Sequence, residues 1–219
     1  MVGNEVPDPV SSLDREEASL AARVGDEAHN VLLLAPPMDP CAEDGCADFL
    51  TVDAPSEEDV LYVTFVQSPD DRLESWRSRV GNERPARIGF VDVDGSTRSA
   101  VDATAGGGPA VDVTIQTVSS PGNLTDLGIK VSEYVEAWEA DGNQTVICFH
   151  SLTALLQYAD LQRAFRFLHV LTGRVRTTNG FAHYHMDPSA HDPRTLNTLM
   201  TLFDGVVEWD GEDWSVRSR

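Results

Sequence analysis

Short apolar runs alternate with amphipathic stretches along most of the chain. The apolar runs have the length of single β-strands and are rich in β-branched and aromatic residues, which favours strands over buried helices. They predict strands at residues 30–35, 59–66, 86–93, 111–118, 144–150 and 180–185. Between most of these runs, apolar residues recur with the spacing of one helix face. These stretches predict helices at residues 13–24, 68–80, 123–142, 161–178 and 192–203.

Three of these helices begin with residues that can cap a helix. Ser68 is followed by Pro69 and Asp71, which gives a capping-box pattern with proline at the first helical position. Asn123 and Asp192 precede two further helices. Because a cap satisfies backbone N–H groups that the helix leaves open, we expect these helices to begin at those residues.

The alternation of strands and helices predicts an α/β fold. Several strands are apolar throughout, which is typical of strands buried on both faces of a parallel sheet. We therefore expect a three-layer α/β/α domain with a mostly parallel central sheet, in which the strand at 111–118 lies near an edge. Residues 205–209 and 214–218 predict a hairpin at the C-terminal end of the domain.

The chain has 219 residues, of which 41% are hydrophobic, so it can bury a substantial core. We expect residues 1–27 to form an N-terminal arm and helix, and residues 28–219 to form a single domain. The glycine-rich stretch 95–110 has no periodicity and predicts a flexible loop. Three cysteines are too few for a disulfide scaffold. The chain start lacks the features of a signal peptide, and no apolar run could span a bilayer, so we expect a cytoplasmic protein without membrane contact.

The charge is strongly acidic. The formal net charge is −20, the isoelectric point is about 4.4, and Lys130 is the sole lysine. The carboxylates are spread along the chain instead of forming one tail. Molar salt shortens the Debye length to about 3 Å and screens the repulsion between such charges, so this pattern favours a salt-rich cytoplasm. The alternative is a surface for a partner of opposite charge. The lack of a basic stripe excludes DNA and RNA as expected partners.

The stretch 31–50 begins as a buried strand and continues into residues that would form a phosphate-binding loop in many α/β proteins. Here we expect that loop to be acidic. It contains no Lys or Arg, and its carboxylates are Asp39, Glu43, Asp44 and Asp48. A phosphate about 4 Å from one carboxylate is opposed by about 1 kcal/mol even in water-like surroundings.

Four segments then follow in a familiar order. VLYVTFVQSPDDRL at 60–73 resembles the second core strand and helix of KaiC-like proteins in the RecA superfamily, of the kind found in halophilic archaea. QTVICFHSLTALLQY at 144–158 resembles their Walker B strand, and RAFRFLHVLTGRV with GFAHYH resembles the helix and strand that follow. LFDGVVEWDG at 202–211 resembles their closing strand. The resemblance covers roughly residues 28–216, and it places the strand at 180–185 between those at 30–35 and 144–150.

The resemblance also implies which ATPase residues this chain has lost. If Gly45 takes the place of the last P-loop glycine, Cys46 replaces the phosphate-binding lysine and Ala47 replaces the Mg²⁺-binding hydroxyl residue. The Walker B aspartate would fall at His150, and the catalytic carboxylates would fall at Val66 and Gln67. We therefore expect a degenerate nucleotide site with no cofactor and no ATPase activity.

A metal site is the alternative use of these residues. Imidazole and thiolate groups bind Zn²⁺, and the candidates near the carboxyl edge of the sheet are Cys41, Cys46, His150, His183 and His185. The four residues between Cys41 and Cys46 exceed common zinc spacing, and we expect His183 and His185 to face opposite sides of their strand. The sequence thus favours histidines that make hydrogen bonds over a metal site.

Three functions remain open. The first is a non-catalytic KaiC/RecA-like domain that acts through a protein partner or a homo-oligomer as a regulatory or adaptor protein. The second is a metal-dependent enzyme that uses a His/Cys site at the former nucleotide pocket, and the third is a nucleotide binder without hydrolysis. The densest cationic run in the chain follows residue 160 and suggests a docking face for an acidic partner or another copy of the chain; its arginines are Arg163, Arg166, Arg174 and Arg176.

Overall fold

The computed structural model of the chain describes residues 19–37, 39–81, 83–93, 112–140 and 142–218. The expected arm, the first part of the expected N-terminal helix and the glycine-rich loop lie outside the described residues. No helix in the described part of the chain is long and apolar enough to cross a membrane.

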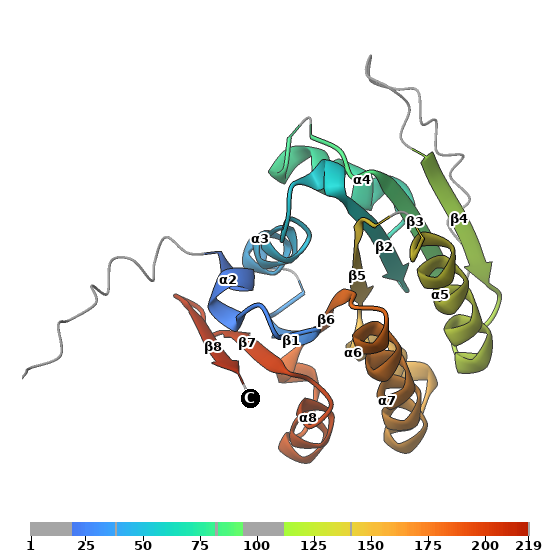
Figure 1. Cartoon of the computed structure of the whole chain (residues 1–219). Helices are drawn as coiled ribbons and strands as arrows, with labels where there is room; N and C mark the ends of the chain where they lie inside the picture. Colours follow the sequence, from blue (N-terminus) through green and yellow to red (C-terminus); the bar gives the residue numbers. More distant parts are fainter. Residues whose placement is uncertain (1–18, 38, 82, 94–111, 141, 219) are drawn as a thin grey trace, which may run out of the picture.

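The centre of the fold is an eight-stranded sheet with the order β4-β3-β2-β5-β6-β1-β7-β8. All neighbouring strands run parallel except β7 and β8, which pair antiparallel. The expected α/β class and mostly parallel sheet are therefore confirmed. Figure 1 shows the sheet running from β4 at one edge to β8 at the other. The strands are β1 Asn30–Leu34, β2 Glu58–Thr64, β3 Arg87–Val93, β4 Asp112–Val118, β5 Gln144–His150, β6 Phe181–Met186, β7 Gly205–Trp209 and β8 Trp214–Ser218.

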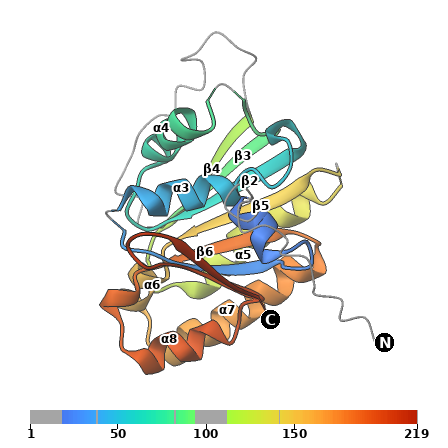
Figure 2. The ribbon, with the colours of Figure 1, turned by 90° about the vertical axis from the view of Figure 1, so that its left-hand side faces the viewer.

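Helices lie on both faces of the sheet (Figures 1 and 2). One face packs against α2 Leu20–Val24, α3 Pro40–Phe49 and α4 Pro69–Arg79. The other face packs against α5 Leu124–Trp138, α6 Leu152–Tyr158, α7 Leu161–Thr177 and α8 Pro193–Met200. The core therefore has two parts, one on each side of the sheet. Strands buried on both faces need apolar residues at successive positions. Two short 3₁₀ turns, Pro55–Glu57 and Pro188–Ala190, complete the elements.

The predicted caps are confirmed. The Ser68 side chain accepts a hydrogen bond from the Asp71 backbone, and the Asp71 carboxylate accepts one from the Ser68 backbone, which closes the capping box. Asn123 caps α5 and Asp192 caps α8. The edge position of β4 and the closing hairpin are also as expected. Each of these features depends on a few adjacent residues, which is why the sequence pattern predicts it.

Two helical elements differ from the sequence expectation. The stretch 40–49, expected to belong to a long loop, is helix α3, so that only five residues separate it from β1 in the sequence. The reason is visible locally, since Pro40 occupies the first helical position and Asp39 caps it. The short helix α6 was not expected, although Ser151 caps it by accepting a hydrogen bond from the Ala154 backbone.

Candidate functional site

Helix α3 starts at the carboxyl edge of the sheet, where a phosphate-binding loop would lie. The Asp39 carboxylate accepts a hydrogen bond from the Cys41 backbone N–H at 3.1 Å. This bond lowers the pKa of Asp39, so the capping carboxylate stays charged. A phosphate would need the same free N–H groups and the positive end of the helix dipole. The Asp39 carboxylate thus takes the position that a bound phosphate would occupy at the N-terminus of α3.

The alignment of Gly45, Cys46 and Ala47 with the end of a phosphate loop is wrong. All three residues lie inside α3, beyond its first turn, where backbone N–H groups bond within the helix. Gly45 serves close packing, because a Cβ at this position would lie 2.9 Å from the Trp214 ring. Cys46 points into the core instead, where its side chain is 2% exposed.

The carboxylates expected to line the loop have structural partners. Glu43 accepts hydrogen bonds from the Arg72 guanidinium at 2.5 Å and from the Ser75 hydroxyl at 2.7 Å. Asp44 pairs with Arg79 at 2.9 Å, which joins α3 to α4. The Asp48 carboxylate, in turn, accepts a hydrogen bond from the first backbone N–H of α2. The acidic residues therefore hold helices together and do not surround an open loop. The cation paired with Glu43 is Arg72 from α4.

The other positions matched to lost catalytic groups do lie at the ends of their strands. His150 is the last residue of β5, while Val66 and Gln67 follow β2. Val66 is 76% exposed. Burial lowers the pKa of His150 well below its ordinary value, with a smaller contribution from His185, so the ring is neutral near pH 7. A neutral imidazole, an aliphatic group and an amide cannot replace the carboxylates that hold Mg²⁺ and activate water in ATPases.

A group of sulfur and nitrogen atoms lies beneath α3, between that helix and the sheet. Cys46 comes from α3, Cys148 from β5, and His183 and His185 from β6. All four residues are buried, and one ligand atom from each lies within 4.8 Å of all the others. The Sγ of Cys46 is 3.6 Å from the Sγ of Cys148 and 3.3 Å from the Nε2 of His183. We call these four residues the Cys/His cluster.

Aromatic and charged neighbours fix the cluster in place. The Phe49 ring stacks on His183 with a centroid separation of 5.5 Å. The Arg72 guanidinium lies 3.9 Å from the Cys46 sulfur and pairs with Glu43, so a buried ion pair adjoins the cluster. The Cys148 thiol and the two imidazoles stabilise a thiolate at Cys46, whose pKa lies well below its ordinary value. Burial, followed by the bond to Cys46, raises the pKa of Cys148.

The cluster corrects the expected set of candidates. His183 and His185 share one face of β6, with ring centroids 5.2 Å apart, because strand side chains two positions apart point the same way. The expectation that they diverge was wrong. Cys148 was missed, although the parallel pairing of β5 and β6 sets it directly opposite His183. The His150 ring lies 4.7 Å from that of His185, but neither His150 nor Cys41 is among the four cluster residues.

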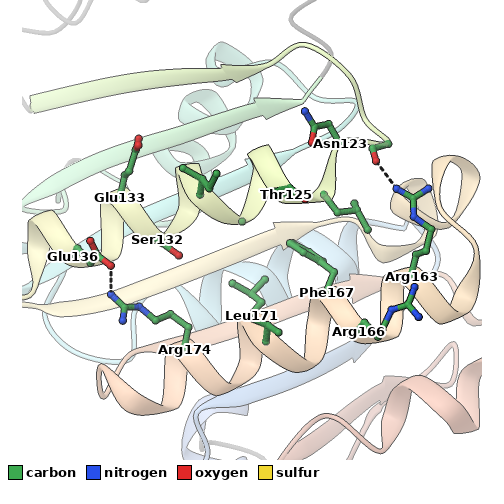
Figure 3. Close-up of a pocket in the computed structure, with 15 residues that line it drawn as sticks. Asn123, Thr125, Ser132, Glu133, Glu136, Arg163, Arg166, Phe167, Leu171 and Arg174 are labelled. Carbon is green, nitrogen blue, oxygen red and sulfur yellow. Dashed lines mark hydrogen bonds and ion pairs between the residues drawn. The ribbon is translucent and has the colours of Figure 1, made fainter.

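A second feature lies on the opposite face of the sheet. A groove of about 680 Å³ runs between α5 and α7 (Figure 3). Its apolar residues include Ile129, which is 52% exposed, and Val170, which is 71% exposed. Phe167 and Leu171 complete the apolar floor. Scattered exposed apolar residues are ordinary, but several along one groove are typical of a surface that contacts another molecule.

Arginines line the groove. Arg163 donates a hydrogen bond to the Gly122 carbonyl at 3.0 Å, and Arg174 pairs with Glu136 at 2.7 Å, both drawn in Figure 3. Arg166 lies between them along α7 and makes no ion pair with any described residue. Arg176, the fourth arginine of this run, instead pairs with Asp204 at 2.6 Å. Three guanidinium groups along one groove are distinctive in a chain with a net charge of −20. We call this surface the α5/α7 groove.

Comparisons with known proteins identify a family but no activity. The model of a family of unknown function, DUF7504, matches residues 28–209, so the chain belongs to that family. No curated protein matches the chain. A similar solved structure, described only as the structural study of a project target from Pyrococcus horikoshii OT3, shares 11% sequence identity with a TM-score of 0.53. The match covers 88% of this chain and 86% of that one, and at this identity it shows the fold alone.

Proposed function

We propose that this DUF7504 member is a non-catalytic domain of the KaiC/RecA type, which acts through protein contacts as a regulator or adaptor in a high-salt cytoplasm. The finer fold assignment, a three-layer RecA-like arrangement, belongs to this proposal. Strand β6 between β1 and β5 supports it, because the resemblance of the sequence implies that strand order. The antiparallel hairpin of β7 and β8 at the C-terminal edge supports it further.

Several features of the former nucleotide site support a non-catalytic role. A phosphate would compete with the Asp39 carboxylate for the N-terminus of α3. The two arginines that contact this helix are already paired, Arg72 with Glu43 and Arg79 with Asp44, and Arg72 is 2% exposed. Hydrolysis also needs a held Mg²⁺ and an activated water, for which His150, Val66 and Gln67 offer no carboxylate.

The observation that carries the protein-contact function is the α5/α7 groove. Its apolar floor would lose contact with water on binding, and Arg166, which makes no ion pair with a described residue, would meet a carboxylate of the partner. The chemistry of the groove therefore fits an acidic protein segment with one apolar face, such as an amphipathic helix. In a salt-rich cytoplasm most exposed protein surfaces are acidic, so a groove that carries arginines also discriminates against the general background.

Calorimetry with Mg²⁺ and ATP tests the loss of nucleotide binding. In molar KCl we expect no saturable ATP binding at submillimolar concentration and no hydrolysis above background. A functional P-loop ATPase measured in the same buffer serves as the positive control. Saturable binding without turnover would favour the third function, a nucleotide binder without hydrolysis. It would refute the proposal that the chain has lost nucleotide binding.

Site-specific crosslinking tests the groove. A photo-crosslinking residue at Val170, expressed in the native host, should capture a defined acidic partner that an Arg166→Glu change removes. The matched control is Arg77→Glu, which makes the same charge change at an exposed position of α4 on the opposite face. Capture of the chain itself would assign the groove to a homo-oligomer. If the Arg166 and Arg77 variants capture the same proteins as the wild type, the groove is not the contact surface.

A further inference from the structure

The Cys/His cluster has the composition of a metal site. Two thiolates and two imidazoles form one of the common ligand sets of structural Zn²⁺. Among the described residues, this is the group whose ligand atoms converge closely enough to hold an ion. Its members come from three separate elements and are up to 139 positions apart in sequence, from Cys46 to His185. The fold therefore brings the four residues together, and no local sequence motif predicts the group.

The distances agree with tetrahedral coordination. Zn–S bonds of about 2.3 Å and Zn–N bonds of about 2.0–2.1 Å place neighbouring ligand atoms about 3.3–3.8 Å apart. The sulfur–sulfur separation of 3.6 Å and the sulfur–nitrogen separation of 3.3 Å fall within that range. The widest separation in the group is no more than 4.8 Å. Closing it requires a shift of about 1 Å, which a small side-chain rotation supplies.

The cluster also contains ring nitrogens without partners. Within the described chain, the Nε2 of His185 and the Nδ1 of His183 are buried and make no hydrogen bond. A buried polar atom left without a partner destabilises the fold, because it has lost its hydrogen bonds to water. His185 is 4% exposed and lies beside His183, so its ring cannot turn to bulk water. A cation bound by the four residues would give His185 the partner that no described residue supplies.

The charges balance around a divalent ion. Zn²⁺ bound by two thiolates is neutral as a unit, and the adjacent pair of Arg72 and Glu43 is neutral as well. A divalent cation at this position would stabilise both thiolates and take a lone pair from each imidazole.

We propose that Cys46, Cys148, His183 and His185 bind one structural Zn²⁺ that fastens α3 to the centre of the sheet. This goes beyond the proposed function and reverses the sequence-based expectation of no metal. All four positions around the ion are taken by protein groups, and the site is buried. Such closed coordination is typical of structural zinc, whereas catalytic zinc keeps a position for water or substrate. The geometry therefore also argues against the metal-dependent enzyme.

The metal content of the purified full chain tests this proposal. Protein expressed in zinc-supplemented medium and purified in high KCl without chelator should contain about one Zn²⁺ per chain. The double variant Cys46→Ser, Cys148→Ser should keep less than about a tenth of the wild-type zinc. Cys41→Ser is the matched control, because Cys41 is a buried cysteine of the same helix outside the cluster, and it should keep all of the zinc.

A spectroscopic measurement on the wild type tests the proposal even if the double variant fails to fold. Wild-type protein grown or reconstituted with Co²⁺ should show thiolate-to-cobalt charge-transfer bands and the intense visible bands of tetrahedral Co²⁺. Chelation should lower the melting temperature, and added Zn²⁺ should restore it. Wild-type protein with less than about 0.1 zinc per chain would overturn the proposal. A disulfide between Cys46 and Cys148, stoichiometric iron, or zinc retained by the double variant would overturn it equally.

Discussion

Glu58 allows a quantitative prediction about stability and pH. It is the first residue of β2, with a side chain that is 0% exposed. One carboxylate oxygen accepts a hydrogen bond from the Asp53 backbone at 2.7 Å, while the other has no partner in the described part of the chain. Burial dominates over this bond and raises the pKa of Glu58 from 4.5 to about 7. Folding therefore favours the protonated form of this residue.

The sign of the effect follows from the raised pKa. The stabilisation is fully present below pH 4.5, where both folded and unfolded chains are protonated, and it is lost as the pH rises through about 7. A difference of about 2.5 pKa units corresponds to about 3 kcal/mol of unfolding free energy, as an order of magnitude. Glu58→Gln keeps a hydrogen-bond acceptor for Asp53 but removes the titration. Relative to the variant, the wild type should thus lose about 3 kcal/mol between pH 4 and pH 9.

Urea unfolding in molar KCl, followed by tryptophan fluorescence, measures this difference at each pH. The many other carboxylates contribute equally to both proteins and cancel in the comparison. Glu57→Gln is the control, because it makes the same substitution at an exposed neighbouring position. A Glu58→Gln difference that changes by less than about 0.5 kcal/mol over the range would refute the reasoning.

Two further predictions concern the charge and the packing. Because the net charge is −20, the melting temperature should rise steeply from dilute buffer to molar KCl; a flat profile would favour the acidic-surface interpretation over salt adaptation. Gly89→Ala should destabilise the fold by about 1–3 kcal/mol, since a Cβ there would lie 2.7 Å from the Tyr134 ring and 2.8 Å from Trp138. Gly173→Ala, in α7 with open space around it, should instead stabilise by about 0.5–1 kcal/mol, and equal effects at the two sites in thermal or urea unfolding would contradict the packing argument.

The parts of the fold that sequence reasoning predicted are those that local chemistry determines. The capping box at Ser68 and Asp71 needs only four adjacent residues, and strand β5 contains the uninterrupted apolar run 146–149. The start of α3 was missed although it follows the same local rules, because the residues after the first strand were interpreted as one long loop. The signal was present in Asp39 and Pro40, a cap followed by proline at the first helical position.

The candidate site could be predicted only in part, because its geometry depends on strand pairing. His183, His185 and Cys46 were among the metal candidates, but Cys148 was not. Its place in the cluster follows from the register that sets it opposite His183, and no pattern within β5 reveals that register. Arg72 is similar: the sequence marks it as a helix residue, whereas its burial against Glu43 depends on how α4 packs on α3. Contacts between elements were therefore the information that the sequence alone lacked.

The two proposed sites lie on opposite faces of the sheet, and this separation has a consequence for how they act. The Cys/His cluster belongs to the core beneath α3, whereas the α5/α7 groove sits on helices that pack against the other face. A metal that fastens α3 to β5 and β6 makes α3 rigid. In a working ATPase, the helix at this position would contact the nucleotide. The metal leaves the groove unchanged, because the groove residues belong to α5, to α7 and to the two residues that precede α5. A change of zinc content should thus alter the stability of the domain, while the charge of the groove should alter its partners.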